Sequence, residues 1–155
     1  MKNNKGFSLV ELIIVIAIMA ILVGVMAPQL IKYIEKTNVS SDTQLCDSVK
    51  TAITTAMMDP SVISAASNGI PSNTGMASIS TITTGNAFGD AFYEIMGATN
   101  SAGVIAGLKS HSAPGTVVND IQFAIVGSNA VHVTIPGSDS TGKKNGSANP
   151  DIYVD

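Results

Sequence analysis

The side chains that could carry chemistry are few, and they are not clustered. Cys46 is the one cysteine, so the sequence excludes an intramolecular disulfide framework and a cysteine-based zinc site. His111 and His132 have no acidic or cysteine partner at a metal-ligand spacing. Asp139 and Asp151 flank a loop without the dense alternating acids of a calcium-binding loop. We therefore expect no catalytic residue, no metal and no cofactor, and hence a protein that is not an enzyme.

Glu11 is the exception, because it stands where an ionisable side chain is costly. It precedes Leu12–Ala27, a run of sixteen residues without any charged or hydrogen-bonding side chain. A carboxylate next to so apolar a run costs several kcal/mol unless it is paired, and such residues are by default functional. The sequence therefore points to Glu11 as the first candidate for a functional role.

The apolar residues are concentrated in one N-terminal segment. Residues 7–27 contain 18 of them in 21 positions, whereas the 128 residues from Pro28 onward contain 51. As a helix the segment is about 30 Å long, which matches the hydrocarbon core of a bilayer. Lys2 and Lys5 precede it, so the positive-inside rule predicts a cytoplasmic N-terminus and a single membrane pass.

Three interpretations of this segment differ in where the chain is cut. A secretory signal would be cleaved after the small residues near Ala27, but Pro28 would then follow the cut and Glu11 would lie at the start of its apolar region. An ordinary transmembrane anchor fits the length but leaves Glu11 unexplained. The third interpretation places the cut between Gly6 and Phe7, before the apolar run.

The residues from Lys5 to Ile13, KGFSLVELI, resemble the class III signal peptide of type IV pilins and pseudopilins. The match covers about the first 30 residues and joins a basic leader, Gly-Phe, a hydroxyl residue and a Glu at fixed spacing. The resemblance implies that a prepilin peptidase cuts after Gly6 and methylates the new amino group of Phe7. It also implies that Glu11 acts in assembly and that Pro28 stands where many pilins carry a helix-kinking proline.

The charge of Glu11 supports this resemblance independently. Cleavage after Gly6 would expose a cationic amine at Phe7, four residues before the carboxylate. Pairing the two charges offsets much of the cost of burying either one. The pair forms either within one helix or between the amine of one subunit and Glu11 of its neighbour, and the sequence leaves both open.

A single helix is predicted from Phe7 to about Met58, roughly 78 Å long. Gly24 and Pro28 weaken it, as an ordinary kink or as a stretch that melts during packing. Residues 37–41 contain few helix formers, so Asp42 is a candidate cap for a restarted helix. Beyond Asp42 the helix is predicted to carry an apolar stripe, formed by Leu45, Val49, Ala52, Ile53, Ala56 and Met57. Asp59-Pro60 is predicted to end the helix.

The rest of the chain, residues 59–155, is predicted to form an α+β globular head. Gly, Ser, Thr and Asn account for 41 of its 97 residues. Residues 61–86 are predicted to be a long loop with a short strand at 78–82. We expect a helix over 86–96 that ends at Gly97, and an antiparallel sheet that packs on the long helix; its strands are 120–126, 131–135 and 152–154. The predicted organisation is thus a leader (1–6), a long helix (7–58, with 7–27 in the membrane) and a head.

The function that these features favour is a structural subunit, most simply the major pilin, of a type IV pilus-like filament. The resemblance implies a helical homo-oligomer, a prepilin peptidase, the cytoplasmic membrane and a pilus assembly machinery as partners, with surface localisation after assembly. A pseudopilin of a type II secretion or DNA-uptake system is the alternative, and a membrane-anchored binding domain is a further one. Arginine is absent and the net charge is −3, so no strongly basic nucleic-acid surface is expected.

Overall fold

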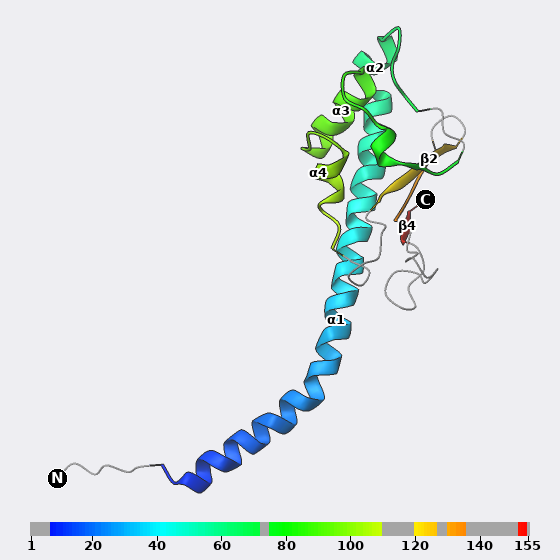
Figure 1. Ribbon diagram of the computed structural model, residues 1–155. Coiled ribbons are helices and arrows are strands. Elements are labelled where there is room, and N and C mark those ends of the chain that lie inside the picture. Colours follow the sequence, from blue (N-terminus) through cyan, green and yellow to red (C-terminus); the bar gives the residue numbers. More distant parts are fainter. Residues whose placement is uncertain (1–6, 72–74, 110–119, 127–129, 136–151, 155) are drawn as a thin grey trace, which may run out of the picture. The chain divides into compact units, whose positions relative to one another are not determined.

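The computed structural model describes residues 7–71, 75–109, 120–126, 130–135 and 152–154 (Figure 1). The chain divides into two compact units, residues 1–37 and residues 38–155. The predicted leader, residues 1–6, lies outside the described residues. The first unit is helical throughout its described part from Leu9 on, and the second unit contains short helices and an antiparallel sheet. The fold is α+β, as the sequence predicts.

The long helix α1 spans Leu9–Met58, which is 50 residues. It begins two residues after the expected start and ends where the sequence predicts. It also continues without a break through residues 37–41, so the prediction that Asp42 caps a restarted helix is wrong. Asp42 is instead fully buried in the middle of α1, and its Oδ1 accepts the backbone N–H of Lys109 at 2.7 Å. That tertiary hydrogen bond supplies the stability that local helix propensity lacks.

Asp59 separates α1 from a second helix, α2 (Pro60–Ser64), which the sequence did not predict. The Asp59 carboxylate caps α2 by accepting the N–H of Ser61 at 2.7 Å, and Pro60 occupies the first turn, where it needs no hydrogen-bond partner. Hydrogen bonds from the hydroxyl and the backbone N–H of Ser61 hold the pKa of Asp59 below its ordinary value. The expected loop over 61–86 therefore begins as a helix.

The sheet has four antiparallel strands in the order β1-β2-β3-β4. They are β1 (Ala77–Ser78), β2 (Gln122–Val126), β3 (Ala130–Ile135) and β4 (Ile152–Val154). Phe123 pairs with Val133, and Val133 pairs with Val154, so the three predicted strands are confirmed. The strand expected at 78–82 is mostly wrong, because the 3-10 helix η1 (Ile79–Thr81) follows β1 directly. Residues 127–129, between β2 and β3, lie outside the described residues.

Two capped helices connect β1 to β2. Helix α3 (Ala87–Met96) begins after Asn86, whose side chain accepts the N–H of Gly89, and ends at Gly97, which has a φ of 64°. Both ends agree with the prediction, since a left-handed residue after the last turn is the usual place for glycine. Helix α4 (Ser101–Ile105) was not predicted, although Asn100 caps it in the same way as Asn86 caps α3.

The core of the second unit joins α1 to α3 and the sheet. Val49 and Ile53 from α1, Phe88 and Phe92 from α3, and Phe123 from β2 are fully buried. The predicted stripe of α1 is confirmed, because four of its six residues are buried and Leu45 and Met57 are partly buried against the same core. Phe92 also packs edge-on against Tyr93 with ring centroids 5.0 Å apart, and the Tyr93 hydroxyl donates to the carbonyl of Ile82 at 2.6 Å.

Cys46 is a fully buried free thiol. Burial, together with the negative charges of Asp42 and Asp47, raises the pKa of Cys46 to about 12. The thiolate is the reactive form of cysteine, so Cys46 belongs to the inert core and offers no nucleophile.

Replacing Asp42 with Ala is expected to destabilise the second unit by about 1–3 kcal/mol, because the Lys109 N–H, in a part-buried hydrogen bond, loses its acceptor. Asp42→Asn is the matched control, since its side-chain oxygen still accepts that N–H. Thermal unfolding of the full chain in a mild detergent, together with amide exchange at Lys109, measures the effect. Equal exchange rates at Lys109 in wild type and Asp42→Ala would show that the bond contributes nothing.

Candidate functional site

The first turn of α1 is built around Glu11. Its Oε2 accepts the backbone N–H of Ser8 at 2.9 Å, just before the helix starts at Leu9. Ser8 and Glu11 thus occupy the N-cap and third positions of a capping box, in which the acidic side chain satisfies an N–H that the helix leaves unpaired. The carboxylate also lies at the positive end of the helix dipole. The motif Ser-x-x-Glu before an apolar run is the sequence signal for this arrangement, and our sequence analysis missed it.

The predicted cleavage site lies immediately before this turn. Gly6 is outside the described residues, while Phe7 is 92% exposed and not helical. Because Phe7 is not part of the helix, α1 does not shield its backbone from a peptidase. Because the Phe7 nitrogen is one residue from the Ser8 nitrogen, a cut after Gly6 would create a cation beside the Glu11 carboxylate. The geometry is therefore compatible with pairing inside one chain, and it does not exclude pairing with a neighbouring chain.

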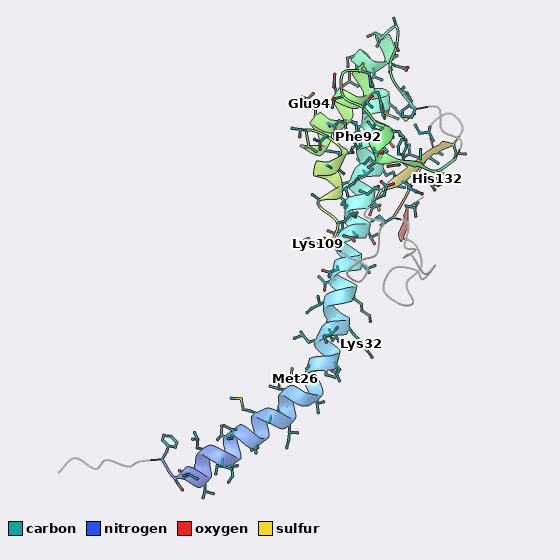
Figure 2. The ribbon with its side chains drawn as sticks, in the orientation of Figure 1. Met26, Lys32, Phe92, Glu94, Lys109 and His132 are labelled. Atoms are coloured by element: carbon teal, nitrogen blue, oxygen red, sulfur yellow. The ribbon has the colours of Figure 1, made fainter. Side chains whose placement is uncertain are left out.

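The apolar part of α1 is not buried by its own chain. Every residue from Phe7 to Ile34 is exposed, and the most hydrophobic window of the helix has a mean hydropathy of 3.0 with none of it buried (Figure 2). By length and composition the helix can cross a membrane, although a signal sequence passes the same test. Nothing in the described residues covers this part of the helix, and a large exposed apolar surface is typical of a membrane or protein contact.

Gly24 and Pro28, the two predicted weak points, are connected through one missing hydrogen bond. Pro28 has no N–H, so the carbonyl of Gly24, four residues earlier, has no helical donor. A Cβ added at Gly24 would meet nothing within 4 Å, so the fold of the isolated chain does not require glycine there. The helix is nevertheless continuous across both residues. Whether this weak turn acts as a kink or melts during packing stays a prediction.

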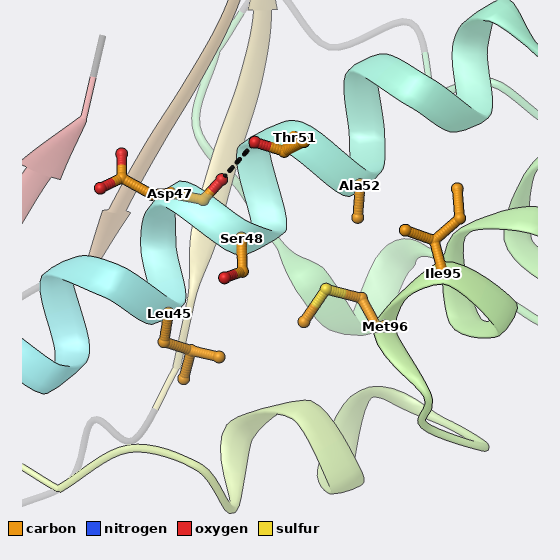
Figure 3. A pocket seen from close by; sticks show the side chains of 7 residues that line it. All are labelled: Leu45, Asp47, Ser48, Thr51, Ala52, Ile95 and Met96. Atoms are coloured by element: carbon orange, nitrogen blue, oxygen red, sulfur yellow. Dashed lines mark hydrogen bonds between the residues drawn. The ribbon is translucent and has the colours of Figure 1, made fainter.

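A second candidate site is an open hollow of about 590 Å³ on the second unit, between α1 and α3 (Figure 3). Asp47 is the one titratable residue of its lining, and the Thr51 hydroxyl donates to the Asp47 backbone carbonyl at 2.8 Å. The Ser48 hydroxyl donates in the same way to the Gln44 carbonyl at 2.9 Å, so both hydroxyls of the lining are held by the backbone of α1. We assign no reaction to the hollow; its lining is Leu45, Asp47, Ser48, Thr51, Ala52, Ile95 and Met96.

The remaining polar candidates do not come together in the described residues. Those residues contain no group of three or more His, Cys, Asp or Glu side chains that could hold a metal ion. His132 is half-buried on β3, while His111, Asp139 and Asp151 lie outside the described residues. The functional candidates of the structure are thus concentrated in the N-terminal segment of α1.

Comparison with known proteins agrees with that placement. The family model for the prokaryotic N-terminal methylation motif matches residues 1–27. A fimbrial protein of Moraxella nonliquefaciens is 46% identical over 55 residues, which is 36% of each chain. A type IV major fimbrial protein, FimA, of Dichelobacter nodosus is 41% identical over 56 residues, also 36% of each chain. A fimbrial protein of Pseudomonas aeruginosa is 39% identical over 59 residues, 38% of each chain.

The N-terminal third of the chain is thus similar to that of type IV fimbrial proteins. The chain matches little more than a third of the length of these curated relatives. No solved structure matches the chain. The matched segment contains the methylation motif and Glu11, and the relatives are named as fimbrial proteins.

Replacing Gly24 with Ala is expected to stabilise the helix around it by about 1 kcal/mol. Alanine restricts the unfolded chain, and its Cβ would have no atom within 4 Å. Pro28→Ala restores a backbone N–H that donates to the Gly24 carbonyl, and this change is expected to stabilise the same helical turns more, by about 3 kcal/mol. Amide exchange of residues 20–28 in detergent micelles measures both changes. Faster exchange in Gly24→Ala would show that glycine is favoured by the helix itself.

Proposed function

We propose that this protein is a structural subunit of a type IV pilus-like helical filament, cleaved after Gly6 and N-methylated at Phe7. One observation carries the proposal: an apolar helix that its own chain leaves exposed begins with a carboxylate, within a match to the methylation motif. The prepilin peptidase and the pilus assembly machinery are the expected partners. The subunit crosses the cytoplasmic membrane once before assembly and lies at the cell surface afterwards.

The same segment serves two apolar environments in this proposal. Before assembly, residues 7–27 lie in the bilayer, and after assembly they pack with copies of themselves in the filament interior. Moving an apolar helix from lipid into a bundle of apolar helices costs little hydrophobic free energy. Apolar contact is also non-directional, so a specific pair is needed to fix how far one helix slides along the next. Glu11 and the Phe7 amine of a neighbouring chain supply that pair.

We infer a major pilin rather than a minor subunit. The name of the Dichelobacter nodosus relatives, type IV major fimbrial protein, supports this choice for the N-terminal third alone. The alternative is a pseudopilin of a secretion or DNA-uptake system, which carries the same N-terminal motif. Electron microscopy of cells that lack this chain discriminates between them, because long surface filaments that persist unchanged would contradict the major-pilin proposal.

The mature chain is expected to begin at Phe7 and to be heavier than the unmodified 7–155 peptide by the mass of one methylene group. The expectation follows from the match of residues 1–27 to the methylation motif. Intact-mass spectrometry of the chain from membranes and from sheared filaments measures it. A retained Met1 or a chain that begins at Pro28 would contradict the proposed processing.

Replacing Glu11 with Ala is expected to leave cleavage intact and to abolish most filament assembly, since an amine buried without its partner costs about 3–5 kcal/mol. Glu11→Gln separates the two roles of the side chain. Its amide oxygen still accepts the Ser8 N–H and keeps the cap, but the charge is gone. We therefore expect Glu11→Gln to fail in assembly too, as counted by filament yield and electron microscopy. Normal filaments in Glu11→Gln would show that Glu11 acts only as a helix cap.

A further inference from the structure

A polar face of α1 begins directly after the apolar segment. Four residues at spacings of three, four and seven occupy it, all exposed, and they line a hollow of about 220 Å³ on the first unit. Tyr33, with 67% of its side chain exposed, is the aromatic member. The residues are Gln29, Lys32, Tyr33 and Lys36, which we call the lysine face. Leu30, Ile31 and Ile34 occupy the other side of the same turns, so this stretch of helix is amphipathic.

The lysine face begins at headgroup depth when the apolar segment spans a bilayer. From Ala27, the last residue of that segment, Lys32 is about 7.5 Å along the helix axis and Lys36 about 13.5 Å. The polar layer on each side of a hydrocarbon core is roughly 5–8 Å thick, so the Lys32 backbone lies within it and the Lys36 backbone about 5 Å beyond it. Side chains of a helix tilt toward its N-terminus, so the long Lys36 stem leans back across that interval. Both ammonium groups can therefore approach the phosphate layer, and Tyr33 lies close to the interfacial position that aromatic residues favour.

The positive charge of residues 28–37 is unexpected on the non-cytoplasmic side of the membrane, where the proposed topology places them. Positive residues are favoured on the cytoplasmic side, where Lys2 and Lys5 stand, and not on the opposite side. Residues 28–37 nevertheless contain two lysines against one acid, Glu35. Two ammonium groups and an amide on one concave face present several donors and a positive field. A phosphate diester is the anion that a membrane places at this depth.

We propose that the lysine face binds the phosphate of an anionic phospholipid in the outer leaflet of the cytoplasmic membrane. The proposal rests on the membrane-anchored stage of the proposed function. Lys32 and Lys36 contact the phosphate oxygens, Gln29 donates a hydrogen bond to them, and Tyr33 packs against the glycerol backbone. This contact fixes the depth and rotation of α1 before assembly, and the subunit gives it up when it leaves the bilayer.

A lipid fits these observations better than a second copy of the chain. The face is continuous with the membrane-spanning segment, and the subunit lies among lipids before it meets another subunit. The second unit does carry exposed acids, including Asp47, so an ion pair between copies in the filament is the competing occupant. The two occupants differ in when the lysines are engaged, and the experiment uses that difference.

Solid-state NMR of the full chain in bilayers tests the proposal through the dephasing of lysine ¹⁵Nζ signals by lipid ³¹P. The bilayers contain phosphatidylglycerol and phosphatidylcholine, and the chain is not assembled. Wild type is expected to show dephased Nζ signal, and Lys32→Gln/Lys36→Gln to lose most of it. Lys50→Gln/Lys109→Gln is the matched control: it removes the same charge from the second unit and is expected to keep the signal. Pure phosphatidylcholine is expected to weaken the dephasing, since choline competes for the phosphate.

Each other result contradicts the proposal in a distinct way. Equal dephasing in both double variants would show that these lysines make no special contact. Equal dephasing by inorganic phosphate in nonionic detergent would make the face a general phosphate site and not a lipid site. Absent dephasing, with filaments lost only in Lys32→Gln/Lys36→Gln, would assign the face to a second copy. Filaments are scored separately, so wild-type cells without filaments but with intact dephasing would refute the filament proposal alone.

Discussion

The structure depends on one constraint: the free energy of keeping an apolar helix with one carboxylate out of water. Among the described residues of the first unit, nothing buries the apolar part of α1, and every residue from Phe7 to Ile34 is exposed. Removing such a surface from water gains about 25 cal/mol per Å² of apolar area, which favours a bilayer or a bundle of helices over solution. Glu11 sets the geometry within that requirement, because its charge is tolerated only next to donors or a cation.

The hydrogen bond from the Ser8 N–H to Glu11 lowers part of the cost of this charge within a single chain. A carboxylate that already accepts the Ser8 N–H is oriented and partly compensated before any neighbour arrives. An incoming amine therefore adds to an existing interaction and does not meet an unpaired charge. The cap also fixes where the helix begins, at Leu9. In the proposed filament, the same side chain serves both the start of the helix and the register of assembly.

The sequence predicted the elements whose signals are local. The end of α1 at Met58, the Asn86 and Gly97 caps of α3 and the alternating strands β2 and β3 each follow from a pattern within a few residues. The errors have a common cause. Asp42 was read as a cap because residues 37–41 contain few helix formers, but its partner is Lys109, 67 residues away, and no local pattern encodes that bond. For Ser78–Ile82, the Ser78 hydroxyl accepts the Ser80 N–H and turns the chain into η1.

The candidate site was predictable to a different extent from the fold. Glu11, Gly24 and Pro28 stand out because their residue types conflict with the apolar helix around them, and such conflicts are where function or strain concentrates. The hydrogen bond from Ser8 to Glu11 also has a sequence signal, Ser-x-x-Glu. The apolar run that follows explains the cost of the charge but not this bond. The lysine face shows the reverse case. The sequence alone does not distinguish its lysines from other surface charges, and it is the hollow on α1 that places Lys32 and Lys36 on one face with Gln29 and Tyr33.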